Sequence, residues 1–260
     1  MESKTIKLLD GSVHAIDELI DNAYSDEFYY DYLGKATLSS STCKLLLDSP
    51  KTYHYVTKYG QKSSQALRSG WLFHTMILEP DKIEECVFVN VQSKNTKAFK
   101  QAKEYHDQVF TIKEKQEAER LVDAFHRNDH TAKFMTDAKY EVPKVGLIDG
   151  IPFRGKADVL QTKGGLVDLK TTVDVKNFQI SAQKFKYHVQ VYIYCTLFNV
   201  PPSEFTFIAI DKNNLDIGIF KCSQEFYERG RDETLQAIEL YNNFFLQPKD
   251  IDSYVYEGLL

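Results

Sequence analysis

The sequence predicts one α/β domain in which helices flank a mixed β-sheet, and three observations lead to this fold class. Helical patterns dominate up to about residue 138. Short β-rich segments follow, separated by Asp-Gly and Lys-Gly-Gly, which are hairpin signals. A helical pattern over 177–198, two strands around residues 212–214 and a final helix that begins near Ser223 complete the chain. This order favours a single sheet covered by helices.

Composition limits the classes of function. The 260 residues are 43% hydrophobic, which is enough for a substantial core, and the net charge of −5 excludes a generally basic nucleic-acid coat protein. Any binding of phosphates is therefore expected to be local, through a patch or a metal ion. The four cysteines are scattered without a C-x-x-C pair, so neither a disulfide framework nor a zinc site is expected. Without a leader or a long apolar run, we expect a soluble cytoplasmic protein with no membrane partner.

We expect an acidic, tyrosine-rich N-terminal arm over residues 1–38, followed by a single domain over residues 39–260. The first forty residues hold eight acidic residues against three lysines. A solvated surface segment is the favoured interpretation, and a segment that contacts a partner or another subunit is the alternative.

Three helical stretches precede the strands. "SSSTCKLLLDSP" has the serine start and proline stop of a short helix. In "SSQALRSGWLFHTMILEP", Leu67, Trp71, His74 and Leu78 fall at i, i+4, i+7 and i+11, which predicts that His74 lies on the inward face. A histidine there is usually a satisfied core residue, and a metal ligand is the alternative. Residues 94–128 form a charged helical pattern with a lysine stripe, for which a solvated face is favoured over a DNA-backbone contact. The stripe consists of Lys94, Lys97, Lys100 and Lys103.

The predicted strands bring charged residues together. In "LVDLKTT", Asp168 and Lys170 lie two positions apart and share a face. A hairpin that turns about Lys163 would place Asp158 of "IPFRGKADVL" opposite Asp168. In that strand, alternation predicts Arg154, Lys156 and Asp158 on one face, and Phe153, Ala157 and Val159 on the other.

Two facing carboxylates require either a proton or a bound cation, because like charges directly opposite are destabilising. Mg²⁺ is the ordinary cation for carboxylate ligands. Such a metal beside a lysine can promote hydrolysis of a phosphodiester. Because D-x-K alone also occurs by chance, a surface salt bridge on a hairpin remains the alternative. Tyr187, Gln190 and Tyr194 share one face of the next helix, either as hydrogen-bonding partners of a substrate or as ordinary buried and capping residues.

Four motifs in order resemble one family. "SGWLFHTMILEP", "GIPFRGKADVL", "LVDLKTT" and "YHVQVYIY" are similar to the nuclease domain of the exonuclease VIII (RecE) family, in the RecB-type branch of the PD-(D/E)XK nucleases. The similarity covers roughly residues 39–220. It implies a PD-(D/E)XK nuclease core, with a central mixed β-sheet flanked by helices. Ala157 stands where the superfamily name has proline, and the N-terminal arm has no counterpart.

The resemblance also implies the residues of the site and the cofactor, which is Mg²⁺ with Mn²⁺ as a substitute. It differs from Cas4-type nucleases, whose clustered cysteines hold an iron–sulphur cluster, so no cluster is expected here. A glutamate near the site corresponds to Glu141. The implied roles are metal ligation by His74, Asp158, Asp168 and the Leu169 carbonyl, catalysis by Asp158, Asp168, Lys170, Gln190 and Tyr194, and substrate binding by Arg154 and Lys156.

The function implied is a Mg²⁺-dependent 5′-to-3′ exonuclease that acts on double-stranded DNA ends and exposes single strands for recombination or for an annealing protein. Such enzymes form ring-shaped homo-oligomers. Residues 139–190 hold nine basic against five acidic residues, an excess that a DNA channel would use. Two alternatives remain, a structure-specific or site-specific endonuclease on the same fold and a DNA-end binding module that does not cut.

Overall fold

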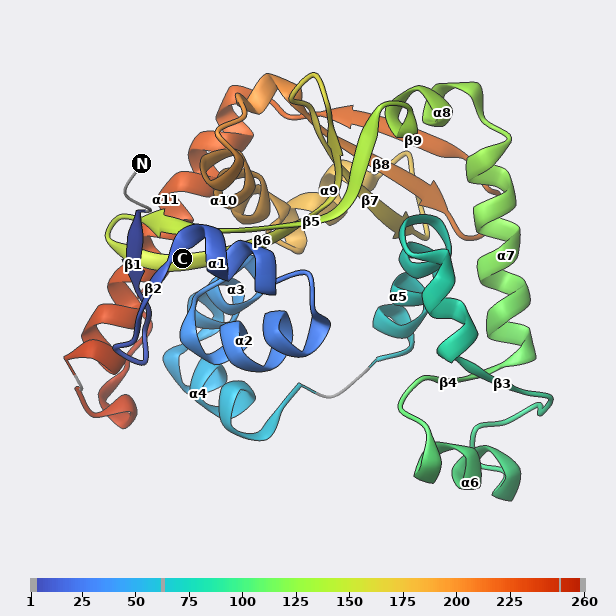
Figure 1. The fold of residues 1–260 in the computed structure, drawn as a ribbon, viewed down its shortest axis with the longest axis horizontal. Coiled ribbons are helices and arrows are strands. Elements are labelled where there is room, and N and C mark those ends of the chain that lie inside the picture. Colours follow the sequence, from blue (N-terminus) through green and yellow to red (C-terminus); the bar gives the residue numbers. More distant parts are fainter. Residues whose placement is uncertain (1–3, 62–63, 248, 258–260) are drawn as a thin grey trace.

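The computed structural model describes residues 4–61, 64–247 and 249–257. The described residues form a central five-stranded sheet in the order β5-β6-β7-β8-β9 (Figure 1). β7 and β8 pair in parallel, and the other neighbouring pairs are antiparallel, so the sheet is mixed as predicted. The strands are β5 (Ala138–Ile148), β6 (Ile151–Gln161), β7 (Leu166–Thr172), β8 (Phe205–Asp211) and β9 (Ile217–Lys221).

The β5–β6 hairpin turns at Asp149-Gly150, where the sequence predicts it. Both residues have positive φ, 49° and 77°, as a two-residue type I′ turn requires. The register runs from Ile148 opposite Ile151 back to Ala138 opposite Gln161. These two long strands form one side of the site.

The parallel β7–β8 pair needs a crossover, which α9 (Phe178–Lys184) and α10 (Tyr187–Phe198) provide. The single helix expected over 177–198 is therefore wrong. Lys186 has a left-handed φ of 51° between the two helices, and its ammonium lies 2.6 Å from Glu233 of α11 (Gln224–Tyr241). The break redirects α10 along the sheet.

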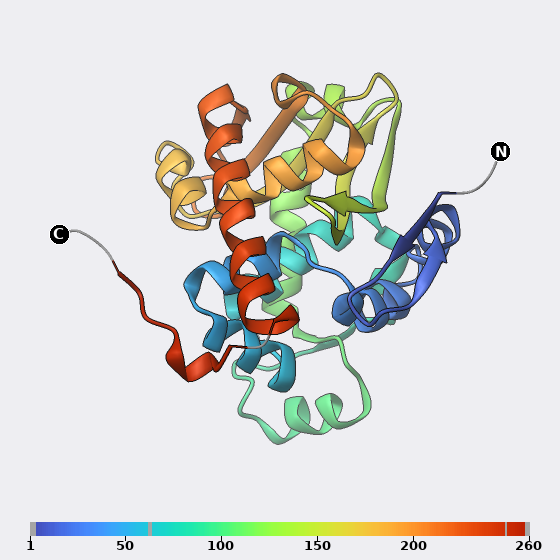
Figure 2. The ribbon, with the colours of Figure 1, turned by 90° about the vertical axis from the view of Figure 1, so that its left-hand side faces the viewer.

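Helices cover the sheet from two sides. Val189 and Ile193 of α10 pack with α11 and with α3 (Ser40–Asp48), and Figure 2 shows α11 crossing α10. On the other side, Phe73 of α5 (Gln65–Leu78) and Leu121 of α7 (Ile112–His126) pack against β7 and β8. None of the helices formed by the described residues is long and apolar enough to cross a membrane.

Serine caps begin α11 and three earlier helices. Ser39 caps α3, and Ser49 precedes Pro50 at the first position of α4 (Pro50–Tyr59). Ser64 caps α5. The proline that was expected to stop the first helix thus also starts the next.

The inward face of α5 differs from the predicted stripe. Leu67 is 54% exposed, whereas Leu72, Phe73 and Ile77 are buried. His74 nevertheless points toward β6 and contacts Asp158. Phe73, Ile77 and Leu78 pack on the sheet, whereas Leu72 packs against Phe110 of β4 (Val109–Thr111). The predicted stripe therefore holds for Leu78 and fails at Leu67.

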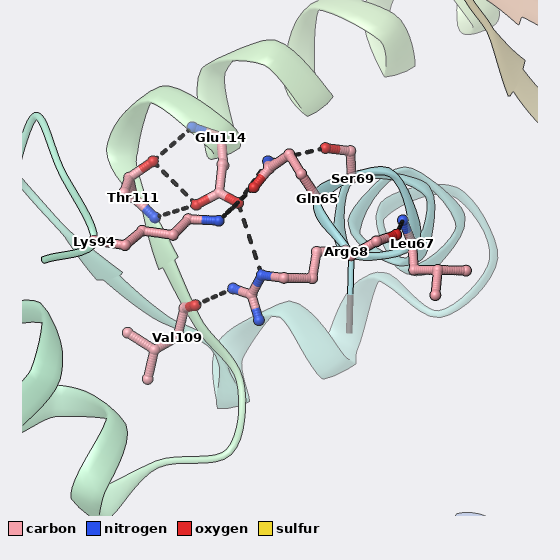
Figure 3. A network of polar contacts seen from close by, with 9 residues as sticks. Gln65, Leu67, Arg68, Ser69, Lys94, Val109, Thr111 and Glu114 are labelled. Carbon is pink, nitrogen blue, oxygen red and sulfur yellow. Dashed lines mark hydrogen bonds and ion pairs between the residues drawn. The ribbon is translucent and has the colours of Figure 1, made fainter. Parts of the chain in front are cut away.

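Residues 94–128 form two helices separated by a strand, not one continuous helix. Lys97, Lys100 and Lys103 are exposed on α6, as the solvated-face interpretation expects, but Lys94 turns inward. Its ammonium donates to Glu114 of α7, which also accepts hydrogen bonds from Gln65 and Thr111 (Figure 3). This network joins α5, β4 and α7. The elements here are η2 (Pro80–Glu85), β3 (Val87–Val89), α6 (Lys97–Tyr105), β4 (Val109–Thr111), α7 and α8 (Asp129–Met135).

Residues 4–38 pack against the sheet. Ile6, Leu19, Tyr29 and Leu33 are buried in one cluster with Val145 of β5, so a merely solvated arm is the wrong interpretation. The boundary at residue 38 stays a prediction. The elements are β1 (Thr5–Lys7), β2 (Val13–Ala15), α1 (Ile16–Asn22), the π-helix η1 (Glu27–Tyr32) and α2 (Leu33–Ala36).

The remaining short elements connect or follow the larger ones. They are η3 (Pro202–Glu204), η4 (Asn242–Leu246) and η5 (Ile251–Ser253).

The four cysteines are free thiols, as expected.

Candidate active site

The site begins where β6 and β7 separate. Their ladder pairs Val159 with Val167 and Leu160 with Leu166, which is the register of the predicted hairpin about Lys163. At the next position, Asp158 Oδ2 accepts a hydrogen bond of 2.7 Å from the Leu169 amide. A carboxylate thus takes the place of a ladder carbonyl, and this fixes the Asp158 side chain at the fork.

Alternation along β6 is interrupted at this fork. Phe153 and Ala157 pack in the clusters that contain α10, as one face requires. Val159, predicted on the same face, packs instead with Phe73 of α5. The prediction is wrong for Val159 because the strand changes the face it presents around Asp158.

Three ligand-bearing side chains converge beside Asp158. One ligand atom each from His74, Glu141 and Asp158 lie within 4.8 Å of one another. His74 Nδ1 is 3.3 Å from Asp158 Oδ2. Glu141 has φ 48°, between the ladder pairs Tyr140–Val159 and Val142–Ala157. This left-handed conformation is uncommon for a non-glycine residue and is typical of functional sites.

Electrostatics in this group favour a cation. Burial, together with the charge of Asp168, raises the pKa of Asp158 to about 6. Burial and the charge of Asp158 raise the pKa of Glu141 to about 8. The positive charge near these two carboxylates therefore does not offset their burial and mutual repulsion, and a divalent ion would supply the difference. Two carboxylates and an imidazole fit such an ion, since the oxygens suit Mg²⁺ or Mn²⁺ and the nitrogen suits a transition metal.

Asp168 lies beside this group but is not one of the three. Asp168 is only 1% exposed. Gln190 Nε2 donates a hydrogen bond to its Oδ1, and the Lys170 ammonium contacts its Oδ2 in an ion pair. Because a carboxylate oxygen can accept from more than one donor, Oδ2 can take a further partner beside the Lys170 ammonium. Of the four predicted metal ligands, the structure brings together His74 and Asp158; ligation by Asp168 and by the Leu169 carbonyl stays a prediction.

Lys170 is held as a cation. Burial by itself would lower the pKa of Lys170, but Asp168 and Asp158 beside it raise that pKa overall. Its ammonium also lies 5.0 Å from the ring centre of Tyr187. The predicted sharing of a face by Asp168 and Lys170 is confirmed by their contact.

The α10 residues line the same region. Tyr194 packs so closely on β6 that a Cβ added at Gly155 would lie 3.0 Å from its Cε1 atom. Burial raises the pKa of Tyr194 well above its usual value, so its hydroxyl stays protonated. A direct role for Tyr194 in substrate placement stays a prediction.

Sequence reasoning missed Lys44 of α3, which lies 5.1 Å from the Tyr187 ring centre. Burial, with Lys170 nearby, lowers the pKa of Lys44 to about 8. Its position inside "SSSTCKLLLDSP", the opening of the resemblance, was the available signal. Glu141 carried such a signal too, but the sequence did not show that it would join His74 and Asp158.

The two predicted substrate-binding residues are engaged internally. The Arg154 guanidinium donates to the Leu33 carbonyl at 3.0 Å and to Thr37 at 3.3 Å. Lys156 Nζ lies 2.9 Å from Asp26 Oδ1. Arg154 and Lys156 are only 8% and 7% exposed. Arg154 thus anchors the N-terminal segment in this structure, and substrate binding by Arg154 and Lys156 stays a prediction.

Comparison with known proteins places this geometry in a family. PDDEXK-like domains of unknown function (DUF3799) match residues 39–247. A solved structure from Eubacterium rectale, described as a "Putative exonuclease", is 16% identical with a TM-score of 0.61, over 91% of this chain and 95% of that chain. A "phage related exonuclease" from Haemophilus somnus 129PT is 13% identical over 82% of this chain and 97% of that chain, with a TM-score of 0.37, too low to establish a shared fold. No curated protein matches the sequence.

At such identities the structural likeness shows the fold alone. The family match supports the PD-(D/E)XK superfamily that the resemblance implied, while membership of the exonuclease VIII family stays a prediction. The match spans most of the chain, and its residues hold the whole central sheet and the carboxylate–histidine group. This chain belongs to the family of PDDEXK-like domains of unknown function (DUF3799).

Proposed function

We propose that this protein is a metal-dependent deoxyribonuclease that removes nucleotides from the 5′ ends of double-stranded DNA. The observation that carries the proposal is the group of His74, Glu141 and Asp158 beside the Asp168–Lys170 pair. Metal-assisted hydrolysis of a phosphodiester requires carboxylates that can bind a cation and a charged lysine beside them. This PDDEXK-like fold places both side by side, and nearby positive groups do not fully offset the charge of the carboxylates.

His74, Glu141 and Asp158 would hold the divalent ion, with Asp168 next to them. When bound, the ion supplies an acidified water and neutralises charge on a phosphoryl oxygen. Lys170 remains protonated and presents a donor to the developing negative charge of the phosphate. Asp168 contacts the Lys170 ammonium and is itself held by Gln190, so these two residues orient the lysine.

The finer parts of the proposal rest on the resemblance to the exonuclease VIII family. They are Mg²⁺ as the physiological ion with Mn²⁺ as a substitute, 5′-to-3′ polarity, assembly into a ring-shaped homo-oligomer, and transfer of the exposed strand to an annealing protein. Asp168 and the Leu169 carbonyl as further ligands, and Tyr194 as a support for the substrate, belong to the same proposal.

A digest of linear duplex DNA labelled at one 5′ end tests the activity and its polarity together. With Mg²⁺, the protein should release the label as short products, and EDTA should prevent release. Lys170→Ala should abolish release while the protein stays folded, as circular dichroism can show. Lys163→Ala, in the exposed β6–β7 turn, is the matched control and should remain active. Full activity of Lys170→Ala would refute the assignment.

Two further substrates separate the alternatives. An exonuclease leaves closed circular DNA intact, whereas an endonuclease on the same fold cuts it. A module that only binds DNA ends would show salt-dependent binding with no metal-dependent loss of substrate.

A further inference from the structure

Two lysines converge on one carboxylate beside the candidate metal group. Asp26, which precedes η1, is 2.9 Å through Oδ1 from Lys156 Nζ and contacts Lys82 Nζ through Oδ2. Lys82 Nζ is also paired with Glu79 Oε1 at 2.7 Å. Lys156 Nζ is also 3.9 Å from Oε2 of Glu141, a member of the metal group. Asp26 lies outside the residues 39–247 that the family matches, whereas both lysines lie inside them.

The three side chains differ in their freedom to move, and that of Lys82 is 31% exposed. The Lys156 side chain is 6% exposed, and its ammonium lies 4.8 Å and 5.2 Å from the ring centres of Tyr29 and Tyr30. The Asp26 side chain is 44% exposed. The lysine is therefore fixed and the carboxylate can rotate into solvent, so Asp26 is the replaceable partner.

A buried ammonium needs an anion, because desolvation of an unpaired charge is costly. A carboxylate and a phosphodiester each carry one negative charge on two oxygens. Exchanging one for the other leaves the charge of the site unchanged. Two ammonium groups that contact the two oxygens of one anion therefore form a site that a DNA phosphate can also occupy.

We propose that Lys82 and Lys156 form a phosphate-binding subsite next to the metal group, and that Asp26 occupies this subsite until a phosphate of the DNA backbone displaces it. The inference rests on the proposed function for the identity of the ligand. The N-terminal segment would then inhibit DNA binding through Asp26, whose side chain must leave the subsite before a backbone phosphate can enter.

Binding of a short blunt-ended DNA duplex to the full-length protein, measured by fluorescence anisotropy in EDTA, tests this without cleavage. Asp26→Asn should bind about fivefold more tightly than the unmodified protein, because a competing charge is removed. Asp31→Asn is the matched control: it makes the same charge change at an exposed position of η1, and should raise affinity much less. Equal gains in the two variants, or weaker binding by Asp26→Asn, would overturn the proposal.

A second variant covers the case in which Asp26→Asn does not fold. Lys82→Met, with its partner Asp26 intact, should weaken duplex binding severalfold, and unchanged binding would equally overturn the proposal. Because these are affinities in EDTA, they stay informative if the protein cleaves no DNA. Conversely, normal cleavage with unchanged affinities would leave the nuclease assignment intact and remove only this subsite.

Discussion

Helix α5 contributes to two buried acidic sites that behave in opposite ways. At its beginning, Gln65 donates to Glu114, which also accepts from Lys94 and from Thr111, and the pKa of Glu114 is lowered even though burial tends to raise it (Figure 3). Near its end, His74 meets Asp158, whose pKa rises to about 6. The two acids are similarly buried, 7% and 9% exposed.

The difference lies in the donors around each carboxylate. Glu114 has its charge satisfied by an ammonium, an amide and a helix cap, which suits a structural brace. Asp158 faces Asp168 and a second carboxylate, Glu141, and this leaves room for an added cation. Hydrogen-bond donors outweigh burial at Glu114 but not at Asp158, and this difference separates the acid that stabilises from the acid that is expected to bind and react.

The largest effect should come from neutralising the unsatisfied acid. Asp158→Asn should reduce Mg²⁺-dependent nucleotide release about a thousandfold or more. Its melting temperature in EDTA should not fall, because an asparagine carbonyl can still accept from the Leu169 amide and a buried repulsion is lost. Initial rates on labelled duplex and thermal unfolding measure the two quantities. If Asp158→Asn kept its nuclease activity but melted at a lower temperature, Asp158 would be the structural acid and the contrast with Glu114 would be wrong.

Neutralising Glu114 should instead lower the stability of the protein and leave its activity unchanged. Glu114→Gln removes the charge that Lys94 and Thr111 stabilise, so we expect a loss of about 2–3 kcal/mol in the free energy of unfolding. Nucleotide release per folded molecule should be unchanged. Glu117→Gln on the same helix, where Lys113 is 3.9 Å away at an exposed position, is the control and should cost less than about 1 kcal/mol. Urea unfolding compares the three proteins.

A third acid extends the comparison through pH. Glu233 accepts hydrogen bonds from Lys186 and Arg229, and His188 Nε2 lies 3.0 Å from its Oε1; despite burial, these three groups lower the pKa of Glu233 to about 2. Since the folded pKa lies below the unfolded value, the stabilisation is present above about pH 4.5 and is lost as the pH falls toward 2. The melting temperature of the unmodified protein should therefore exceed that of Glu233→Gln at pH 7, and the gap should narrow below pH 4.5. A gap that widens in acid would contradict this sign.

Local signals sufficed for several parts of the fold. Asp149-Gly150 can adopt two successive left-handed conformations, so the hairpin and its register followed from a dipeptide and alternation. The turn about Lys163 gave the β6–β7 register in the same way. Ser39 and Ser223 marked the starts of α3 and α11 because their side chains cap free amides.

Other features depend on contacts that alternation and capping do not encode. The break at Lys186 is accompanied by an ion pair to Glu233, 47 positions away. The change of face at Val159 depends on the fork of β6 and β7. The Arg154 anchor requires the N-terminal segment to fold back onto β6, across 121 positions.

The sequence by itself determined the main strands and turns of the sheet and the shared face of Asp168 and Lys170, because short-range turn chemistry and the period of a strand specify which way nearby side chains point. The meeting of His74 with Asp158 was implied by the resemblance of the motifs. Only the tertiary structure decided that Glu141 completes the group with His74, that Asp168 is held by Gln190, and that Asp26 covers Lys156. Those choices depend on strand divergence and on long-range packing, where the lowest free energy is set by many distant neighbours at once.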